Sequence, residues 1–426
     1  MKQTEIGLIP DDWEVKRLGE LCSFHNGVAH EDYVDDNGEF ILVNSKFISS
    51  DTKSKKYSKK QLLKVEENTI LMVMSDVPNG KAIAKCFLVP SKFQGTLNQR
   101  ICMFSEFKMN REFAYRIINR NPYYLSFDDG IKQTNLRKID VLNCPIPLPP
   151  LPEQQRIAKA ISDVDALIST TEKLLQKKKN IKQGTMQELL TGKKRLPGFA
   201  ESNNTKMTEL GEIPEDWEVK TLSEIFEFKP NNTFTRDCLN DSKGEYQNVH
   251  YGDVLIKYSS ILDCSKESIP FINEGINVKF SKYGIMEGDI IIADTAEDET
   301  VGKAVEIYNL GNRKIVSGLH TFLCRKMTDD FAPRWLGYFM NQSIFHNQLL
   351  PFITGTKVSA ISRTAIQNVK VLIPPKEEQT AIANVLSSMD KEIENLNTKL
   401  EKYRNLKTAM MQQLLTGKIR LIGGKR

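Results

Sequence analysis

The chain contains the same short sequence block twice, and this internal duplication constrains its fold more than any other feature. Residues 4–21, TEIGLIPDDWEVKRLGEL, match residues 208–225, TELGEIPEDWEVKTLSEI, at 12 of 18 positions. The copies lie 204 residues apart, a period far too long for a solenoid. Two copies in one chain therefore predict a pseudo-two-fold molecule, built as a homodimer would be.

A second set of blocks follows in the same order in each half. Residues 149–158, PPLPEQQRIA, correspond to residues 374–383, PPKEEQTAIA, at an offset of 225. The block LLTGK at 189–193 recurs at 414–418 with the same offset. The stretches between the first and second blocks differ almost completely, so the chain alternates two constant parts with two variable parts.

The second constant part of each half has the pattern of a long helix. Prolines precede it and a glycine follows it, which are normal start and stop signals. Apolar residues recur there in alternating steps of about three and four, which is a heptad seam. The seam consists of Ile157, Ile161, Val164, Ile168 and Leu175 in the first copy and of Ile382, Leu386, Met389, Ile393, Leu396, Leu400 and Tyr403 in the second.

A seam this narrow must be buried against another helix, and the other copy is the obvious partner. If the two helices pair antiparallel, the chain returns towards its own start, with one variable domain at each end. About 38 residues at 1.5 Å each give a rod of roughly 57 Å, longer than the roughly 34–36 Å of one turn of B-DNA. A coiled coil that joins two copies of the chain is the alternative, but an intramolecular pair explains better why both halves stay in one chain.

The variable parts, residues 22–148 and 226–373, read as mixed α/β domains rich in strands. Gly80-Lys81 and Gly302-Lys303 are expected at equivalent turns after a strand, so the two domains are expected to share a fold. The expected strands are 40–43, 69–74, 83–89, 289–293 and 304–308, with helices near 111–120 and 333–349.

Basic, amide and hydroxyl side chains in the variable parts are candidate DNA contacts. Lysine supplies charge to phosphates without demanding geometry, whereas Asn and Gln can bind adenine, and Arg guanine, through two hydrogen bonds. The lysine-rich segment 51–60 is equally compatible with a solvated loop. The candidates are Lys53, Lys55, Lys56, Asn98, Gln99, Arg100, Lys132, Gln133, Asn135 and Arg137 in the first domain and Lys279, Arg313, Lys314, Lys357, Ser359 and Arg363 in the second.

Two of these loops are favoured over the others. The segments that begin at Gly130 and Gly355 correspond at the 225 offset and lead towards the constant helices. We expect both loops to lie where the domain meets the helix and to contact DNA.

Composition narrows the class of protein without identifying it. Lys and Arg number 59 and Asp and Glu 54, a net charge of +5, which permits nucleic-acid binding but does not demonstrate it. The seven cysteines include no C-x-x-C pair, so neither a zinc cluster nor a disulfide framework is expected, and a reducing cytoplasm fits. The histidines lack paired-ligand spacing, so no metal site is expected, and no apolar run approaches the roughly 20 residues of a membrane span.

Three motifs resemble catalytic signatures but lack required residues. Residues 121–124, NPYY, lack the second proline of the NPPY motif of adenine N6 methyltransferases, and no glycine-rich turn for a methyl donor accompanies them. Residues 78–81, PNGK, lack the first glycine and the trailing Ser or Thr of a P-loop. The acidic stretch 294–299 lacks the lysine that a metal nuclease needs. Trp13 and Trp217 are interpreted as packing anchors.

Taken in order, the paired blocks resemble the specificity (S) subunit family of type I restriction–modification systems. IPDDWEVKRL with IPEDWEVKTL, PPLPEQQRIA with PPKEEQTAIA, and the two LLTGK helix ends carry the resemblance, which covers nearly the whole chain. It implies an α/β (α+β) fold with two strand-rich target recognition domains separated by two long antiparallel coiled-coil helices. The expected limits are 1–150 and 196–373 for the recognition domains, and 151–195 and 374–426 for the central helix and the C-terminal helix with its tail.

The resemblance also implies a function. Each recognition domain would read one half of a bipartite site in double-stranded DNA, and the helix pair would fix the gap between the halves. The chain would dock two modification (M) subunits, and restriction (R) subunits can join. S-adenosylmethionine and ATP would be bound by those partners, so this chain is expected to have no cofactor and no catalytic residue. Contact with a membrane is not expected either.

Two rival interpretations stay open at this point. A self-contained fusion of reader and methyltransferase would need an added catalytic domain, for which no segment has room. A coiled-coil scaffold that does not bind DNA would show no gel shift with duplexes and no dependence on salt.

Overall fold

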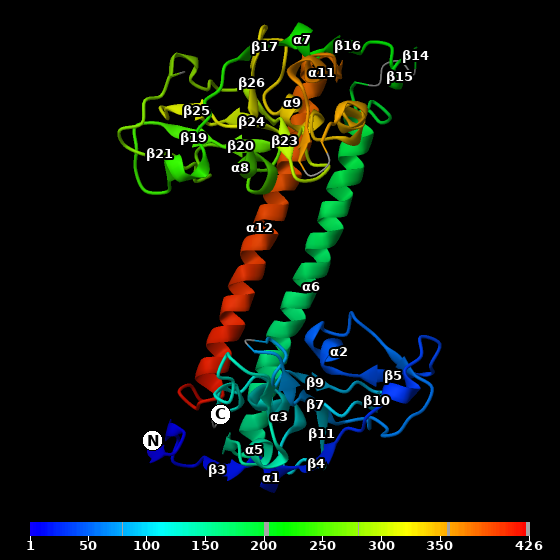
Figure 1. Ribbon diagram of the computed structural model, residues 1–426, viewed down its shortest axis with the longest axis vertical. Helices are drawn as coiled ribbons and strands as arrows, with labels where there is room; N and C mark the ends of the chain where they lie inside the picture. Colours follow the sequence, from blue (N-terminus) through cyan, green and yellow to red (C-terminus); the bar gives the residue numbers. More distant parts are fainter. Residues whose placement is uncertain (79, 200–203, 280, 356–357, 423–426) are drawn as a thin grey trace. The chain divides into compact units, whose positions relative to one another are not determined.

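The computed structural model describes residues 1–78, 80–199, 204–279, 281–355 and 358–422. The chain divides into two compact units, of which unit 1 comprises Met1–Lys173 with Thr398–Arg426 and unit 2 comprises Leu174–Asn397. Each unit contains one strand-rich domain and a part of each of two long helices (Figure 1).

The long helices are α6 (Leu151–Leu189) and α12 (Lys376–Leu414), each of 39 residues. Each begins directly after the prolines of its constant block. Each ends just before a glycine with a left-handed backbone, Gly192 at φ +73° and Gly417 at φ +70°, a conformation that glycine adopts without steric cost. The helices predicted from the heptad pattern are therefore present at both expected places.

The two helices pack against each other within each unit. Higher residue numbers on one helix face lower numbers on the other, so the helices run antiparallel (Figure 1). This confirms the predicted intramolecular pair. The ion pairs that join the helices are Asp165–Lys407 and Glu172–Arg404 in unit 1 and Lys178–Glu392 and Lys182–Asp390 in unit 2.

The seam residues differ in what buries them. Ile157 and Ile161 belong to the hydrophobic core of the domain in unit 1, and Ile382 and Leu386 belong to the core of the domain in unit 2. The first turns of each helix are thus part of a domain core as well as of the helix pair. Farther along the helices Val164, Leu175 and Leu400 are buried, and Ile168, Met389, Ile393, Leu396 and Tyr403 are half-buried.

The domain of unit 1 is built on an antiparallel sheet in the order β4-β11-β7-β9. A smaller sheet has the order β10-β5-β6, with β10 parallel to β5. The strands of these sheets are β4 (Ser23–Asn26), β5 (Phe40–Val43), β6 (Tyr57–Ser58), β7 (Ile70–Val73), β9 (Cys86–Leu88), β10 (Gly95–Leu97) and β11 (Ile101–Ser105). The helices of the domain are α1 (Leu18–Leu21), α2 (Ser45–Ser49), α3 (Arg111–Ile118), α4 (Pro122–Leu125) and α5 (Lys138–Leu142).

The domain of unit 2 repeats this plan with one extra strand in each sheet. Its main sheet has the order β17-β26-β22-β24-β20. Its smaller sheet has the order β18-β21-β19-β25, with β19 parallel to β25. The strands are β17 (Phe226–Lys229), β18 (Leu239–Asn240), β19 (Gln247–Val249), β20 (Ile261–Asp263), β21 (Phe271–Ile272), β22 (Ile290–Ala293), β24 (Ala304–Tyr308), β25 (Ile315–Ser317) and β26 (Thr321–Lys326). The helices are α7 (Leu222–Ile225), α8 (Tyr251–Ile256), α9 (Trp335–Phe339), α10 (Ser343–His346) and α11 (Arg363–Gln367).

The constant N-terminal blocks form matching strands in both units. Each block contributes a hairpin and then a strand that pairs with the strand directly before a long helix. The elements are β1 (Lys2–Thr4), β2 (Gly7–Ile9), β3 (Glu14–Arg17) and β13 (Pro145–Leu148) in unit 1, and β14 (Thr205–Thr208), β15 (Gly211–Pro214), β16 (Glu218–Thr221) and β28 (Lys370–Ile373) in unit 2. The predicted shared α/β fold is therefore confirmed, strand by strand.

Two details of the expected equivalence are wrong. The residue that corresponds to Gly302 is Ala84 and not Gly80, because Ala84 and Gly302 both donate their N–H to the strand before the turn. Gly80 lies earlier in a longer loop, which the carboxylate of Asp76 closes by accepting from the N–H groups of Ala82 and Ile83. The helix expected near 333–349 is two short helices, α9 and α10.

Candidate nucleic-acid interface

Three segments far apart in the sequence meet at one edge of each domain. In unit 1 the N–H of Met74 donates to Arg100 O at 2.9 Å, and the N–H of Leu136 donates to Met74 O at 2.8 Å. In unit 2 the N–H of Asp294 donates to His320 O at 3.1 Å, and the N–H of Ile361 donates to Asp294 O at 2.9 Å. We call residues 74–76, 98–100 and 133–136 edge 1, and residues 294–296, 318–320 and 358–361 edge 2.

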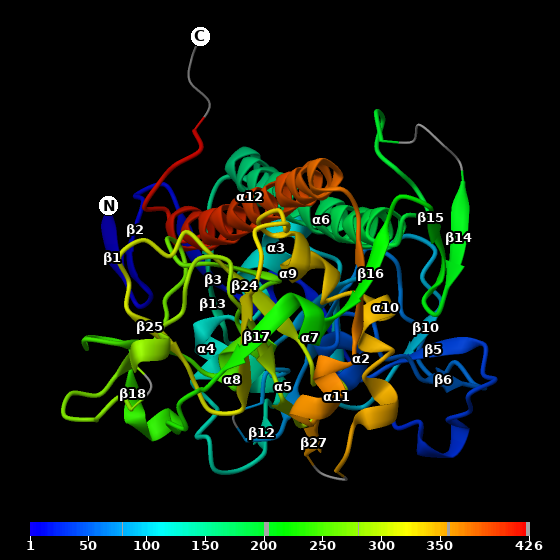
Figure 2. The same cartoon turned by 90° about the horizontal axis from the view of Figure 1, so that it is seen from above.

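Short strand pairs hold each edge together. At edge 1, β8 (Ser75–Asp76) pairs with β12 (Thr134–Asn135), and at edge 2, β23 (Thr295–Ala296) pairs with β27 (Ser359–Ala360). Each pair lies on the side of its own domain that faces away from the long helices (Figure 2). The expectation that these loops lie where the domain meets the helix is wrong, since α5 and β13, or α11 and β28, come between.

Edge 1 carries polar side chains suited to reading bases. The amide of Gln133 donates to Ser75 Oγ at 2.7 Å and to Asn135 Oδ1 at 3.2 Å, which orders these side chains. Arg100 is exposed beside them, and its guanidinium has no ion-pair partner among the residues that the structure describes. The edge thus offers amide groups and a free cation side by side.

Edge 2 has the same backbone but different side chains. Thr295 Oγ1 donates to Asp294 Oδ1 at 2.7 Å, and the Nδ1 atom of His320 lies 3.3 Å from the same carboxylate oxygen. Ser359 is half-buried on β27. Of the residues at edge 2, the sequence interpretation singled out Ser359 and missed His320, because a lone histidine has no spacing signal.

The other candidates of unit 1 flank edge 1. Asn98 and Gln99 lie in the segment before β11, where the amide of Gln99 donates to Glu31 at 2.9 Å. Lys132 is exposed in the loop before β12. The guanidinium of Arg137 donates twice to Asp140, at 2.8 and 2.9 Å. The exposed loop between α2 and β6 carries Lys53, Lys55 and Lys56.

The remaining candidates of unit 2 do not gather at edge 2. Arg313 and Lys314 lie at the opposite end of β25 from His320, where they bond to Glu267 O at 3.2 Å and Glu245 at 2.9 Å. Arg363 donates to Phe228 O at 2.8 Å. Lys279 is exposed in a turn, and Lys357 lies outside the described residues.

The constant blocks of each unit converge on a buried carboxylate. We call this network junction 1 in unit 1 and junction 2 in unit 2. At junction 1, Glu153 accepts from Trp13 Nε1 at 3.1 Å and from Arg420 at 2.8 and 2.7 Å. Arg420 also donates to Asp12 at 2.9 and 2.7 Å. Burial opposes ionisation of Glu153, but the hydrogen bonds from Arg420 and Trp13 outweigh it and lower its pKa. Junction 1 therefore ties the start, the middle and the end of the chain together.

Junction 2 repeats this network in unit 2. Glu378 is fully buried and accepts from Trp217 Nε1 at 3.0 Å and from Arg195 at 2.9 and 2.6 Å. Arg195 also donates to Asp216 at 2.8 and 2.7 Å. Both tryptophans are fully buried, as expected of packing anchors. The sequence interpretation missed both arginines, although Arg195 and Arg420 stand at the 225 offset that would have revealed them.

A second duplicated network joins the helices to the domains. Asp165 pairs with Lys407 of α12 at 2.7 Å and with Arg116 of α3. Its counterpart Asp390 pairs with Lys182 of α6 and accepts from Tyr338 Oη at 2.7 Å. Each aspartate therefore links both helices and the domain of its own unit.

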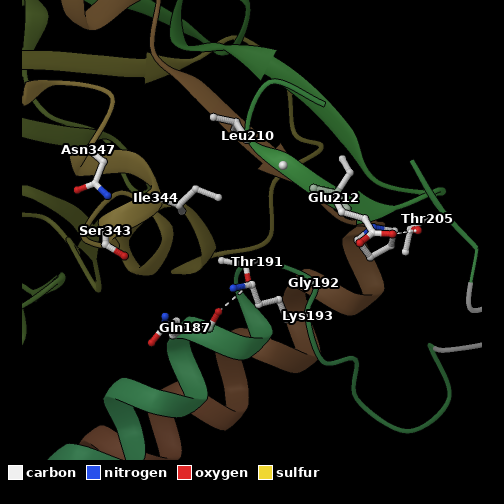
Figure 3. A pocket seen from close by; sticks show the side chains of 13 residues that line it. Gln187, Thr191, Gly192, Lys193, Thr205, Leu210, Glu212, Ser343, Ile344 and Asn347 are labelled. Atoms are coloured by element: carbon white, nitrogen blue, oxygen red, sulfur yellow. Dashed lines mark hydrogen bonds between the residues drawn. The ribbon is translucent and has the colours of Figure 1, made fainter. Parts of the chain in front are cut away.

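A hollow of about 610 Å³ lies in unit 2 between the end of α6, the β14–β15 hairpin and α10 (Figure 3). Lys193 and Glu212 are the charged residues of its lining, and Thr205 Oγ1 donates to Glu212. The lining has no histidine or cysteine. The hollow therefore offers no acid–base or nucleophilic constellation of the usual kind.

Within the described part of the chain, no group of three or more His, Cys, Asp or Glu residues could hold a metal ion. Burial raises the pKa of the Cys22 thiol to about 12 and that of Cys264 to about 11, which leaves these thiols unreactive at neutral pH. Across the same residues, no helix has the length and apolar character needed to cross a membrane.

Comparison with known families agrees with the duplicated plan. A family model for the type I restriction modification DNA specificity domain matches the chain twice, at residues 10–183 and 214–402. The MjaVIII specificity subunit of Methanocaldococcus jannaschii, from a type I restriction enzyme, is 28% identical over 431 residues, covering 97% of this chain and 94% of the relative. The EcoBI specificity subunit of Escherichia coli is 22% identical, covering 76% of this chain and 69% of the relative.

Solved structures show the same fold. The S subunit of a type I restriction–modification system from M. genitalium has a TM-score of 0.54 at 14% identity, covering 94% of this chain and 96% of that chain. A chain from a structure that describes assembly and conformational transition of a type I system has a TM-score of 0.53 at 17% identity, covering 97% and 100%.

Proposed function

The chain belongs to the type I restriction–modification DNA specificity family and is therefore a non-catalytic DNA-recognition subunit, and we propose that its two units read the two halves of one bipartite site in double-stranded DNA. Edge 1 reads one half and edge 2 reads the other. The observation that carries the proposal is that both edges have the same backbone hydrogen bonds and different side chains. A shared backbone places side chains at equivalent positions in the DNA groove of each half-site, while different side chains select different bases.

The candidate residues divide into two roles by their surroundings. At edge 1, Arg100, Gln133 and Asn135 contact bases, and at edge 2, Ser359 does so. Lys132 and the lysine loop of residues 51–56 contact phosphates, because these side chains are exposed and phosphate contacts need charge and little geometry.

The duplicated constant parts present two equivalent surfaces to partners. We propose that two M subunits dock there, one on each unit, and that R subunits join the assembly. S-adenosylmethionine and ATP then come with those partners. The helix pair, residues 151–195 and 374–426, sets the gap between the half-sites.

The test is methylome sequencing of cells that make the chain with its M subunit. Arg100→Ala is expected to lower the discrimination between right and wrong bases at one base pair of one half-site by roughly 1–3 kcal/mol. The other half-site and the gap between the half-sites are expected to stay unchanged. His346→Ala, a substitution on α10 at a residue that belongs to neither edge, serves as the control. An unchanged site for Arg100→Ala would contradict the assignment of edge 1.

Purified protein separates the rival functions. With labelled methyl donor and DNA, the chain alone is expected to transfer no methyl group, and transfer would favour a self-contained methyltransferase. With M subunit present, binding to duplexes is expected to weaken as salt rises. Replacing Lys53, Lys55 and Lys56 by Ala is expected to lower the slope of log affinity against log salt by about 3, because each phosphate contact contributes roughly 0.9. No binding at any salt concentration would favour a scaffold.

A further inference from the structure

We propose that His320 is a specificity-determining residue of unit 2, reading one base pair of its half-site from the position that Arg100 occupies in unit 1. The proposal rests on the proposed function of the two edges. It adds a residue that neither the spacing of motifs nor the family resemblance indicates.

Strand register establishes the equivalence of the two positions. Ile101 pairs with Val73 at the start of β11, and Thr321 pairs with Ala293 at the start of β26. Arg100 and His320 are each the residue directly before these strands. The carbonyl groups of both accept the N–H of the residue that directly follows the neighbouring strand, so the two side chains leave equivalent points of the backbone.

The surroundings of His320 leave one ring nitrogen free for DNA. Nδ1 lies 3.3 Å from the carboxylate of Asp294 and 3.3 Å from Thr295 Oγ1. The ring packs edge-on against Tyr251 at 5.3 Å between centroids. Its side chain is 46% exposed, and Nε2 has no bonding partner in the described parts of the chain. The Asp294 carboxylate and the Thr295 hydroxyl thus engage Nδ1 and leave Nε2 available.

The backbone of His320 gives a second, independent observation. Its φ of +54° is left-handed, a conformation that costs energy for a residue with a side chain and that clusters at functional sites. Unit 1 reaches the same turn without it. This conformation at the exposed edge 2 is explained if it directs the imidazole of His320 towards the DNA.

The tautomer determines what His320 can read. In the tautomer that carries its proton on Nδ1, Nε2 is an acceptor and fits the amino group of cytosine or adenine. In the tautomer that carries its proton on Nε2, this nitrogen is a donor and fits the acceptors of guanine, as the guanidinium of Arg100 does.

Other titratable groups pack on this side of the ring. Burial and then the charge of Arg236 lower the pKa of the neighbouring His250. The titratable and charged side chains that surround His320 directly or through one neighbour are Asp294, Tyr251, His250, Arg236 and Asp253.

The test measures methylation by the complex of the full chain with its M subunit, on duplexes in which each base pair of the second half-site is varied. His320→Ala is expected to lower discrimination at one base pair by about 5- to 150-fold. His320→Arg is expected to shift the preference there to guanine. His320→Gln, which keeps a polar side chain, guards against loss of folding.

The controls separate failure of this proposal from failure of the proposed function. Arg100→Ala is expected to affect only the first half-site, and His346→Ala neither. If Arg100→Ala relaxes the first half-site while all three His320 variants discriminate within twofold of wild type, His320 is not a reading residue. If none of the substitutions at Arg100 or His320 changes discrimination, both assignments are overturned.

Discussion

Arg420 near the C-terminus is expected to stabilise unit 1 far more than its place in the tail suggests. Its guanidinium joins Glu153 on α6 to Asp12 in the N-terminal block with four hydrogen bonds of 2.7–2.9 Å. The Glu153 side chain is only 5% exposed. Arg420→Ala therefore leaves a buried carboxylate that keeps the indole N–H of Trp13, at 3.1 Å, and the backbone of Leu421 as neutral partners but no counter-charge.

The expected loss is about 3 kcal/mol of unfolding free energy at pH 7. Removing one partner of a buried ion pair costs roughly 3–5 kcal/mol, because the other charge stays buried without compensation. The lower end applies here, because Asp12 is half exposed and is solvated once Arg420 is gone. Arg420→Ala with Glu153→Gln is expected to recover part of the loss, because the neutral amide needs no counter-charge.

The loss is expected to shrink as the pH falls. In the wild type the pKa values of Glu153 and Asp12 are lowered, so their contribution is present above the ordinary carboxyl range and is lost as the pH falls through the folded pKa. In Arg420→Ala, burial without Arg420 raises the pKa of Glu153, so the variant gains stability as the pH falls towards 5. The two curves therefore converge in acid.

Urea denaturation, monitored by hydrogen exchange so that the two units are resolved, measures these differences in unfolding free energy. Arg404→Ala is the matched control, because Arg404 forms exposed ion pairs with Glu401 and Glu172 and exposed pairs contribute little. The control is expected to show no measurable change. A loss below about 1 kcal/mol for Arg420→Ala, or a loss that grows as the pH falls, would refute the reasoning.

Other perturbations test the helices and their ends. Lys182→Glu is expected to lower the unfolding free energy of unit 2 by about 2 kcal/mol, measured by denaturation, since it breaks a charge-assisted bond to Asp390. Asp390→Lys in the same chain should restore part of this loss. Equal stability of the single and double variants would contradict the pairing. Gly417→Ala is expected to lower the unfolding free energy by at least about 1–2 kcal/mol, because the φ of Gly417 is +70° and a Cβ would lie 2.5 Å from Pro10 Cδ. By contrast, Gly184 lies in open space inside α6, and Gly184→Ala should raise the unfolding free energy by about 1 kcal/mol. Inserting one heptad into both long helices should change the gap between half-sites and neither half, and an unchanged gap by methylome sequencing would speak against the spacer.

The sequence by itself determined the plan of the molecule. The repeated blocks predicted two equivalent halves, and the heptad seam predicted two long antiparallel helices, both of which the structure confirms. Several strands, such as Phe40–Val43 and Ala304–Tyr308, lie where the apolar runs placed them. These features were predictable because periodicity and helix end signals depend on residues close together in the chain.

The tertiary structure alone decided which residues share an edge. Arg100, Ser75 and Asn135 come together only because β11 pairs with β7 and β12 pairs with β8 in these registers. Arg137 and Arg100 look alike in the sequence, yet Arg137 pairs with Asp140 and Arg100 has no ion-pair partner among the residues that the structure describes. His320 gained its place in the same way, through β25, which ends before it, and β26, which begins after it. Strand register is set by the packing of the whole domain, so local pattern does not reveal which distant loops meet.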